Sequence, residues 1–509
     1  MAWYEEAVFY HIYPLGLLGA PKHNDYSEPV HRLNSLLPWI AHLKMLGFTA
    51  IYIGPLFESV GHGYETTDYR KVDSRLGTNY DLTVFVKACH EAGMKVIFDG
   101  VFNHTGRDFF AFKDLQTKRE ASCYRDWYCN VNFQGNNEYN DGFSYDSWSG
   151  FNLLAKLNLR NPEVRDYIAD VIRFWVKVFD VDGIRLDAAD VLDFDFMKML
   201  RRLAEEVKPD FWLMGEVVHG DYSRWANSET LHSVTNYSLQ MALCDGFNHC
   251  SLREIADTVQ KIRDMVSPDI HLYSFVDNHD VERIYTRLSN KAHYLPIHVL
   301  LYTLPGIPSV YYGSEFGIEV RKECWSDYSL RPYIDLGDHA ADSTDNPCTR
   351  LIRRLGEIHN EYREDLCYGE YRVRLVHEQQ YVFERGTLII AVNCDEHEAE
   401  LCVDAAEDCY TGLLGGAALH CSNGALTIPL GPCEGEIFAP GELSLNQTEK
   451  KKTKPKAEIP YSELGVEELQ ALILARMEKN GPVPDCLKKE VESNIWRDSL
   501  IRWANSFEA

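Results

Sequence analysis

The sequence predicts an α/β protein built on a (β/α)8 barrel. Three observations indicate this fold: eight short β-rich runs, amphipathic stretches that alternate with them, and polar residues that recur where the runs end. Alternating strands and helices favour a parallel sheet with right-handed crossovers. Eight is also the number of strands that closes such a sheet into a barrel.

The predicted strands follow one another along most of the chain. They cover residues 7–14, 48–55, 95–104, 181–190, 211–218, 233–237, 271–280 and 309–313. Helical spacing of apolar residues is clear at 36–46, 80–92 and 162–179. The stretch 292–314 has no Asp, Glu, Lys or Arg, but its prolines indicate a buried helix and a strand instead of a membrane span.

Further segments interrupt or follow this alternation. We expect the barrel at 1–104 and 157–365, an inserted subdomain at 105–156, an all-β C-terminal domain at 366–440, a lysine-rich linker at 441–460 and a helical tail at 461–509. The inserted segment is rich in aromatic residues. Most of them are expected in its core, and two or three in a cleft.

The tail carries apolar residues at helical spacing. The first helix predicted there holds Val466, Leu469, Leu472, Ile473 and Met477, and the second holds Ile495, Trp496, Leu500 and Trp503. Short helices are marginal in water unless something covers their apolar face. We therefore expect a docking or oligomerising element, which covers the chain's own barrel, a second subunit or another protein.

Composition and charge narrow the class of protein. The 509 residues include 51 Lys and Arg against 77 Asp and Glu, a formal charge of −26, so nucleic acid and membrane surfaces are poor partners. The first residues lack the basic segment of a secretory signal. The 14 cysteines form no CxxC pair and predict reduced thiols in a cytoplasmic protein, the alternative being disulfides in a secreted one.

Polar residues crowd the ends of four predicted strands. They are Asp99, Asn103, His104, Arg185, Asp187, Glu216, His279 and Asp280. Each one alone would more often be a helix cap, an ion-pair partner or a packing histidine. Because the carboxyl ends of barrel strands meet at one mouth, their equivalent positions predict a catalytic cluster there.

Four motifs at these positions resemble the α-amylase family of glycoside hydrolases, over about residues 1–440. They are DGVFNH at 99–104, GIRLDAADV at 183–191, GEVV at 215–218 and FVDNHD at 275–280, with GYETTDY at 63–69 as a weaker fifth. CYRDWY at 123–128, YDSW at 145–148 and KLNLRNPEVRDY at 156–167 are similar to the neopullulanase and cyclomaltodextrinase group. The N-terminal β-domain typical of that group is not expected here, which puts its usual dimer in doubt.

The resemblance implies a role for each member of the cluster. Asp187 would be the nucleophile and Glu216 the general acid and then base, a pair that sits ~5 Å apart in retaining enzymes. Asp280 would hydrogen-bond sugar hydroxyls in the transition state. Arg185 would keep Asp187 ionised, while a drier site would raise the pKa of Glu216.

Further residues would bind the sugar. The resemblance implies that His104 and His279 donate to its ring and that Tyr64 stacks on it. Asp327 and Arg331 match positions that hold the next sugar towards the non-reducing end, with a surface ion pair as the alternative.

Two single residues bear on metal binding and on the type of glucosidic linkage that is cleaved. Asn103 matches a position that binds calcium in many amylases, a site often missing in the neopullulanase-like group, and no other cofactor is expected. Ala188, directly after the proposed nucleophile, is the amylase-like choice and favours α-1,4 linkages.

Together these inferences predict a retaining α-glycoside hydrolase. It would cleave α-1,4-glucosidic bonds in maltooligosaccharides, dextrins or cyclodextrins through a covalent glycosyl-Asp intermediate. A transglycosylase or glucanotransferase acting on the same site is the first alternative. A non-catalytic amylase-like binding protein is the second, and the intact carboxylates argue against it.

Overall fold

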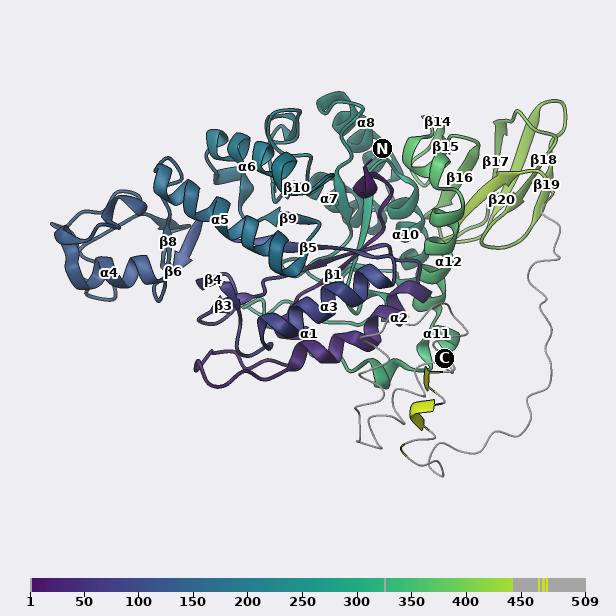
Figure 1. Cartoon of the computed structure of the whole chain (residues 1–509). Helices are drawn as coiled ribbons and strands as arrows, with labels where there is room; N and C mark the ends of the chain where they lie inside the picture. The colour runs from purple at the N-terminus through teal and green to yellow at the C-terminus, as the bar shows by residue number, and fades with distance from the viewer. Residues whose placement is uncertain (1, 325, 443–465, 467–468, 472, 475–509) are drawn as a thin grey trace.

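The computed structural model describes residues 2–324 and 326–442, together with 466, 469–471, 473 and 474. Figure 1 shows three parts of the chain in a row, with the inserted segment on the left, the barrel in the middle and the C-terminal sheets on the right.

Eight parallel strands form the central sheet. They are β1 (Phe9–Ile12), β2 (Ala50–Ile53), β5 (Lys95–Gly100), β9 (Gly183–Leu186), β10 (Trp212–Gly215), β11 (Ser233–Val234), β12 (Tyr273–Phe275) and β13 (Ile307–Tyr311). The first strand pairs with the last, and a bridge between Thr235 and Tyr273 joins the two remaining edges. The sheet closes on itself, so the predicted (β/α)8 barrel is confirmed. Seven strands lie inside the predicted runs, and β13 begins two residues before the run 309–313.

Aromatic side chains fill one end of the barrel. Phe9, Trp212 and Tyr273 are each the first residue of a strand, and all three are buried. The rings of Phe9 and Trp212 stack with their centroids 5.1 Å apart. This layer plugs the end where the strands begin, so a substrate site must use the opposite end.

Helices cover the outside of the sheet (Figure 1). The longer ones are α2 (Leu37–Met45), α3 (Asn79–Glu91), α5 (Pro162–Phe179), α6 (Phe194–Val207), α7 (Tyr237–Asn248), α8 (Leu252–Met265), α10 (Tyr294–Thr303) and α12 (Pro347–Glu361). The bounds of α5 are those predicted from the sequence. The side chain of Asn161 caps this helix by accepting from the backbone N–H of Glu163, and Pro162 opens it.

The inserted segment follows the third barrel strand. It contains β6 (His104–Gly106), α4 (Phe110–Lys118), β7 (Ser147–Trp148) and β8 (Phe151–Lys156), and the three strands form one sheet. Trp127, Tyr128, Phe143 and Tyr145 are buried, whereas Tyr139 and Trp148 are exposed. Most of the aromatic residues therefore serve its core, as predicted.

The C-terminal strands form two antiparallel sheets. One contains β14 (Tyr371–Val376), β15 (Gln380–Arg385), β16 (Leu388–Asn393), β18 (Cys409–Gly412), β19 (Ala418–His420) and β21 (Gly435–Pro440), and the other contains β17 (Ala399–Asp404) and β20 (Ala425–Leu430). Val382, Ile389, Leu401 and Ile428 form a hydrophobic core that joins the sheets. The predicted all-β C-terminal region is confirmed, whereas its domain boundaries stay predictions.

The predicted tail falls largely outside the described residues. Leu472, Met477, Ile495, Trp496, Leu500 and Trp503 lie there, as does most of the lysine-rich linker. Leu469 and Ile473 are described, are helical and fully buried, and belong to the main hydrophobic cluster of the protein. This burial is what docking on the chain's own barrel would produce.

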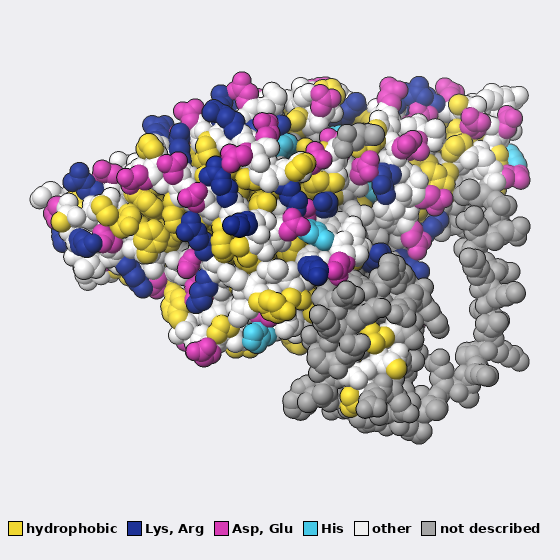
Figure 2. All heavy atoms as spheres, in the orientation of Figure 1, with side chains coloured by type: hydrophobic (Ala, Val, Ile, Leu, Met, Phe, Trp, Pro, Cys, Tyr) yellow, Lys and Arg dark blue, Asp and Glu magenta, His cyan; other side chains and the backbone are white. Residues whose placement is uncertain are grey.

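The surface carries both signs of charge. Figure 2 shows acidic and basic side chains interspersed over the visible face. None of the helices in the described part of the chain combines the length and the apolar character needed to cross a bilayer.

Candidate active site

One arginine at the mouth of the barrel gathers three of the predicted carboxylates. Arg185 lies on β9 and is 2% exposed. Its Nη1 donates to Asp99 Oδ1 at 2.8 Å and to Asp187 Oδ1 at 3.0 Å. Its Nη2 lies 2.9 Å from Glu216 Oε2. A single guanidinium therefore holds carboxylates that come from three neighbouring strands.

The strand register explains this convergence. Asp99 on β5 is the direct partner of Arg185 on β9, and Glu216 directly follows β10. Asp187 comes two residues after Arg185, so both side chains share a face, as expected. Gly54 directly follows the neighbouring strand β2, and a Cβ at that position would lie 2.3 Å from Asp99 Cβ. A glycine is therefore needed there to admit Asp99.

The turn after Asp187 positions Glu216. Ala188 has a φ of 48°, in the left-handed region that costs an alanine about 1–3 kcal/mol. Its backbone N–H donates to Glu216 Oε2 at 3.0 Å. The strained turn thus supplies a second fixed donor to the same oxygen that Arg185 contacts.

Burial raises the pKa values of the central pair. It raises the pKa of Asp187 well above its usual range, against the opposing charge of Arg185 and with the added repulsion of Glu216. Burial likewise raises the pKa of Glu216. Arg185 acts in the expected direction, because its charge lowers the pKa of Asp187 and so favours the ionised form. The contact exists, but desolvation and the neighbouring carboxylates outweigh it.

Asp280 occupies the opposite side of the mouth. Its Oδ1 accepts from Arg331 Nη2 at 2.9 Å, and its Oδ2 lies 3.0 Å from His279 Nε2. Its side chain is 35% exposed, so it still faces solvent. Arg331 is 9% exposed, and its Nη2 lies 3.8 Å from Asp327 Oδ2. The Asp327–Arg331 pair therefore adjoins the site and is not confined to the surface.

The predicted sugar-binding rings lie together beside Asp280. The rings of Tyr64 and His279 stack at a centroid distance of 5.8 Å, and the hydroxyl of Tyr64 contacts His279 Nε2. His104 Nε2 lies 3.2 Å from the carbonyl oxygen of Tyr64. Burial lowers the pKa of His104 to about 3 and the pKa of His279 well below its usual value. Both imidazoles are therefore neutral hydrogen-bonding groups at neutral pH.

The surroundings of Asn103 do not fit a calcium ion. Its Oδ1 is buried and has no hydrogen-bond partner among the described residues, so the Asn103 side chain itself offers one oxygen ligand. Calcium takes about six to eight oxygen ligands. Among the described residues, no group of three His, Cys, Asp or Glu ligands forms around Asn103. The chemistry below is therefore derived without a metal.

The structure adds residues that sequence reasoning missed. Tyr52 donates to Asp99 Oδ2 at 2.9 Å, and the hydroxyl of Tyr13 accepts from Arg331 Nη1 at 3.2 Å. Lys322 donates to the carbonyl of Asp280 at 3.0 Å. Exposed Trp148 lies beside His104, with the ring centroids 6.3 Å apart. Tyr13 and Tyr52 fall at the ends of the first two strands, a position that could have flagged them.

A closed barrel with a pair of carboxylates at its mouth is typical of barrel enzymes that hydrolyse glycosidic bonds. Comparison with known proteins agrees with this class. The family model described as "Alpha amylase, catalytic domain" matches residues 33–346. The chain therefore belongs to the α-amylase family, and the predicted family and enzyme class are confirmed.

Individual relatives match over different shares of their length. A maltogenic α-amylase from Bacillus acidopullulyticus is 29% identical over 453 residues, which are 83% of this chain and 75% of that protein. A cyclomaltodextrinase from Thermoanaerobacter pseudethanolicus is 33% identical over 339 residues, 62% of this chain and 58% of that protein. The solved debranching enzyme of Nostoc punctiforme superposes with a TM-score of 0.74 at 26% identity, covering 86% of this chain and 98% of the other.

Proposed function

We propose that the protein is a retaining hydrolase of α-1,4-glucosidic bonds in maltooligosaccharides, dextrins or cyclodextrins. One observation carries the proposal: Asp187 and Glu216 follow adjacent strands, and a single guanidinium binds both. Retaining glycosidases need two carboxyl groups close together, one to attack and one to donate a proton. Ala188 and the names of the relatives support the α-1,4 linkage.

In the first step, Asp187 attacks the anomeric carbon. Within the described part of the chain, its hydrogen bond to protein uses only Oδ1, so Oδ2 remains for the new C–O bond. Glu216 gives its proton to the leaving oxygen as the glycosidic bond breaks. Burial and mutual repulsion raise both pKa values, which favours a pair that shares one proton, and the attack by Asp187 requires that this proton sits on Glu216.

In the second step, Glu216 acts as the base. Once Asp187 is esterified, its negative charge is gone, and the pKa of Glu216 falls because the repulsion is lost. Glu216 then takes a proton from water, which attacks the anomeric carbon and releases Asp187. Two inversions give net retention.

The remaining residues hold the sugar at the cleavage point. Asp280 accepts from sugar hydroxyls with the carboxylate that Arg331 orients, and the neutral rings of His104 and His279 add hydrogen bonds. Trp148 offers an exposed flat face close to His104. These contacts would act on the distorted ring, where the transition state carries positive charge.

A cavity of about 350 Å³ beside Arg331 has room for more than one further sugar unit. Tyr13, Lys22, Tyr328 and Tyr333 line it, and the ammonium group of Lys22 lies 4.5 Å from the ring centre of Tyr328. Mixed aromatic and polar walls are typical of small-molecule sites. We therefore favour oligosaccharide substrates over single glucosides.

Product analysis tests the proposal. Purified enzyme is incubated with maltoheptaose, β-cyclodextrin, panose and pullulan, and the products are separated by chromatography, with Glu216→Gln as the blank. Shortened maltooligosaccharides with the wild type alone are the expected result. Binding without any cleavage of the four substrates would contradict it.

Transglycosylation is the alternative on the same site, because it shares the covalent intermediate. Incubation with maltotriose separates the two reactions. Products longer than maltotriose as the main outcome would favour a glucanotransferase, whereas glucose and maltose would favour hydrolysis.

Location and assembly are further parts of the proposal. The described cysteines are all free thiols, which supports a reducing compartment such as the cytoplasm. Association of subunits through the segment 461–509 is tested by light scattering of a protein truncated after Pro440. A smaller particle with unchanged activity would support subunit contact, and an unchanged particle with a lower Tm would support docking on the same chain.

A further inference from the structure

A second cavity lies at the end of the barrel opposite the active site. It has a volume of about 440 Å³ and separates the barrel from the C-terminal sheets. His271, Leu272 and Gly306 line it just before β12 and β13 begin, Arg263 enters from α8, and Tyr371 and Arg385 enter from β14 and β15. Its size is within the ~300–1,000 Å³ typical of small-molecule sites.

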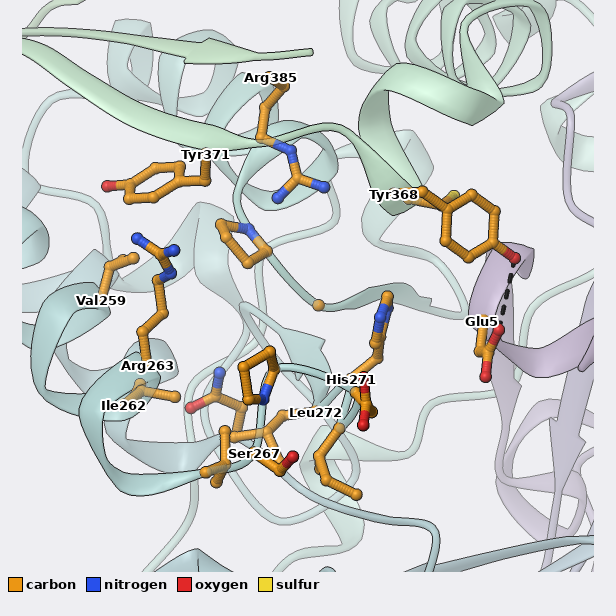
Figure 3. Close-up of a pocket in the computed structure, with 18 of the residues that line it drawn as sticks. Glu5, Val259, Ile262, Arg263, Ser267, His271, Leu272, Tyr368, Tyr371 and Arg385 are labelled. Carbon is orange, nitrogen blue, oxygen red and sulfur yellow. Dashed lines mark hydrogen bonds between the residues drawn. The ribbon is translucent and has the colours of Figure 1, made fainter. Parts of the chain in front are cut away.

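Two arginines reach into this cavity from opposite sides. Figure 3 shows Arg263 rising from α8 and Arg385 descending from β15. Arg385 is 3% exposed, and its Nη2 donates to the carbonyl of Leu366. Its Nε is buried and has no hydrogen-bond partner in the part of the chain that the structure describes. The guanidinium of Arg263, which is exposed, lies 4.8 Å from the ring centre of Tyr371.

No carboxylate among the described residues forms a close ion pair with either of these arginines. Within the described residues, neither guanidinium makes an ion pair within 4.0 Å, and Asp365 acts on Arg385 only at longer range. This is unexpected in a chain where Asp and Glu outnumber Lys and Arg by 77 to 51. Burial lowers the pKa of Arg385 to about 10, and the nearby charge of Arg263 also lowers it. Arg385 is therefore still cationic at neutral pH, and a buried unpaired charge is costly.

Carboxylates do line the cavity, but at other points of its wall. They belong to Glu5, Asp269 and Glu370. Glu5 accepts from the hydroxyl of Tyr368 at 3.4 Å, a contact that Figure 3 also shows. The cavity thus has a cationic part and a separate part with hydrogen-bond acceptors.

We propose that this cavity binds a sugar phosphate. The phosphate group would sit between Arg263 and Arg385 and would take the unused Nε–H of Arg385, because charge-assisted hydrogen bonds from guanidinium groups suit phosphate oxygens. The sugar hydroxyls would donate to the carboxylates of Glu5 and Glu370. A bare phosphate leaves most of the cavity unfilled, which is why the sugar belongs to the proposal.

The position of the cavity predicts how the bound ligand affects glucan binding and stability. It lies where the barrel strands begin, whereas glucan binds where they end, so the two ligands do not compete. A ligand that contacts both α8 and β15 holds the C-terminal sheets against the barrel. Binding to the folded state alone then raises the Tm.

Calorimetry and thermal unfolding of the full chain test the proposal. Glucose 6-phosphate, inorganic phosphate and glucose are compared as ligands, each with and without saturating maltotriose. Glucose 6-phosphate should bind saturably, raise the Tm and be unaffected by maltotriose, and glucose should not bind at this site. Inorganic phosphate should bind at least about tenfold more weakly, because it lacks the hydroxyl contacts.

The key variant is Arg263→Gln, since this exposed side chain is removable without disturbing the fold. We expect it to weaken glucose 6-phosphate binding about tenfold or more. Lys261→Gln is the matched control: it removes one exposed charge from the same helix, away from this cavity. Arg385→Lys, which keeps the charge but loses the fork of donors, should also weaken binding.

Each contrary result has a defined meaning. Absence of saturable binding by the wild type at millimolar glucose 6-phosphate would overturn the site. An Arg263→Gln protein that binds as tightly as the wild type would overturn its location. Equal affinity for phosphate and glucose 6-phosphate would overturn the sugar part of the assignment.

Discussion

The two ends of the barrel each bury an arginine, but the charges around the two guanidinium groups differ. At the mouth, Arg185 is 2% exposed and contacts Asp99, Asp187 and Glu216. At the base, Arg385 is 3% exposed, donates to the backbone carbonyl of Leu366 and makes no ion pair with any described carboxylate. The mouth surrounds a positive charge with negative ones, whereas the base leaves positive charge uncovered.

This difference separates two uses of buried charge. A guanidinium matched by carboxylates fixes their positions and lets burial set the protons they carry, which catalysis requires. A guanidinium without a matching group in the protein favours an anion from solution. The same residue type therefore marks a reaction centre at one end and a ligand site at the other.

Removing either member of the central pair should have the largest effect. Asp187→Asn and Glu216→Gln each replace a reacting carboxyl group by an amide of similar shape, which can neither attack the sugar nor transfer a proton. We expect kcat/KM on maltotetraose to fall about 10³-fold or more, with circular dichroism unchanged. Asp190→Asn is the control, because Asp190 is an exposed carboxylate in the same turn. Turnover within tenfold of the wild type in either variant would remove the pair from the mechanism.

The contrast between the arginines predicts a difference in stability. Arg185→Met leaves three carboxylates without their shared partner and should cost about 3–5 kcal/mol of unfolding free energy. Arg385→Met loses one hydrogen bond to a backbone carbonyl, but it also removes a buried unpaired charge. We therefore expect a smaller loss of unfolding free energy, about 1–2 kcal/mol. Urea unfolding of both variants at one pH measures the difference. Equal losses would break the comparison.

The raised pKa of Asp187 predicts how stability depends on pH. The folded protein holds a proton on this carboxyl at pH values where the unfolded chain has lost it, so its contribution to stability is present at low pH and lost as pH rises through the folded pKa. Asn at this position does not titrate. As pH rises above the ordinary range of a carboxyl pKa, Asp187→Asn should therefore gain stability relative to the wild type, by about 1.4 kcal/mol for each unit of raised pKa. If the unfolding free energies of the wild type and of Asp187→Asn changed in parallel with pH, the raised pKa of Asp187 would be contradicted.

A smaller effect is expected at the stacked rings. Tyr64→Phe removes the hydroxyl that contacts His279 and keeps the ring. The loss of one hydrogen bond corresponds to about 0.5–1.5 kcal/mol, so kcat/KM should fall between about twofold and tenfold. Tyr26→Phe, at an exposed tyrosine, is the control. A fall as large as that of Asp187→Asn would mean that the hydroxyl takes part in the chemistry.

The fold could be predicted from the sequence because its signals are local. Each barrel strand is a short β-rich run, and α5 has its cap, its opening proline and its apolar face within one segment. The ends of the predicted strands also bring Asp187 and Glu216 to one mouth of the barrel. The strand β11 is only two residues long, and its length is set by pairing with neighbouring strands. The sequence therefore predicts where β11 lies better than it predicts how long it is.

What could not be predicted depends on distant contacts. The raised pKa of Asp187 could not be predicted, because it depends on how deeply three strands bury their carboxylates. Arg263 and Arg385 lie far apart in the chain, on a helix and on a strand of another sheet, and no motif connects them. A cavity between such elements becomes visible only once the barrel and the C-terminal sheets are placed together.

Trapping the covalent intermediate tests the central claim most directly. Glu216→Gln is incubated with α-maltosyl fluoride, whose fluoride leaves without protonation as Asp187 attacks the anomeric carbon. Because the base that activates water is missing, the maltosyl ester should accumulate. Peptide mass spectrometry should then find one added maltosyl unit on the peptide that contains Asp187. An adduct on Asp280, or fluoride release without any adduct and with β-maltose as the first product, would contradict the account.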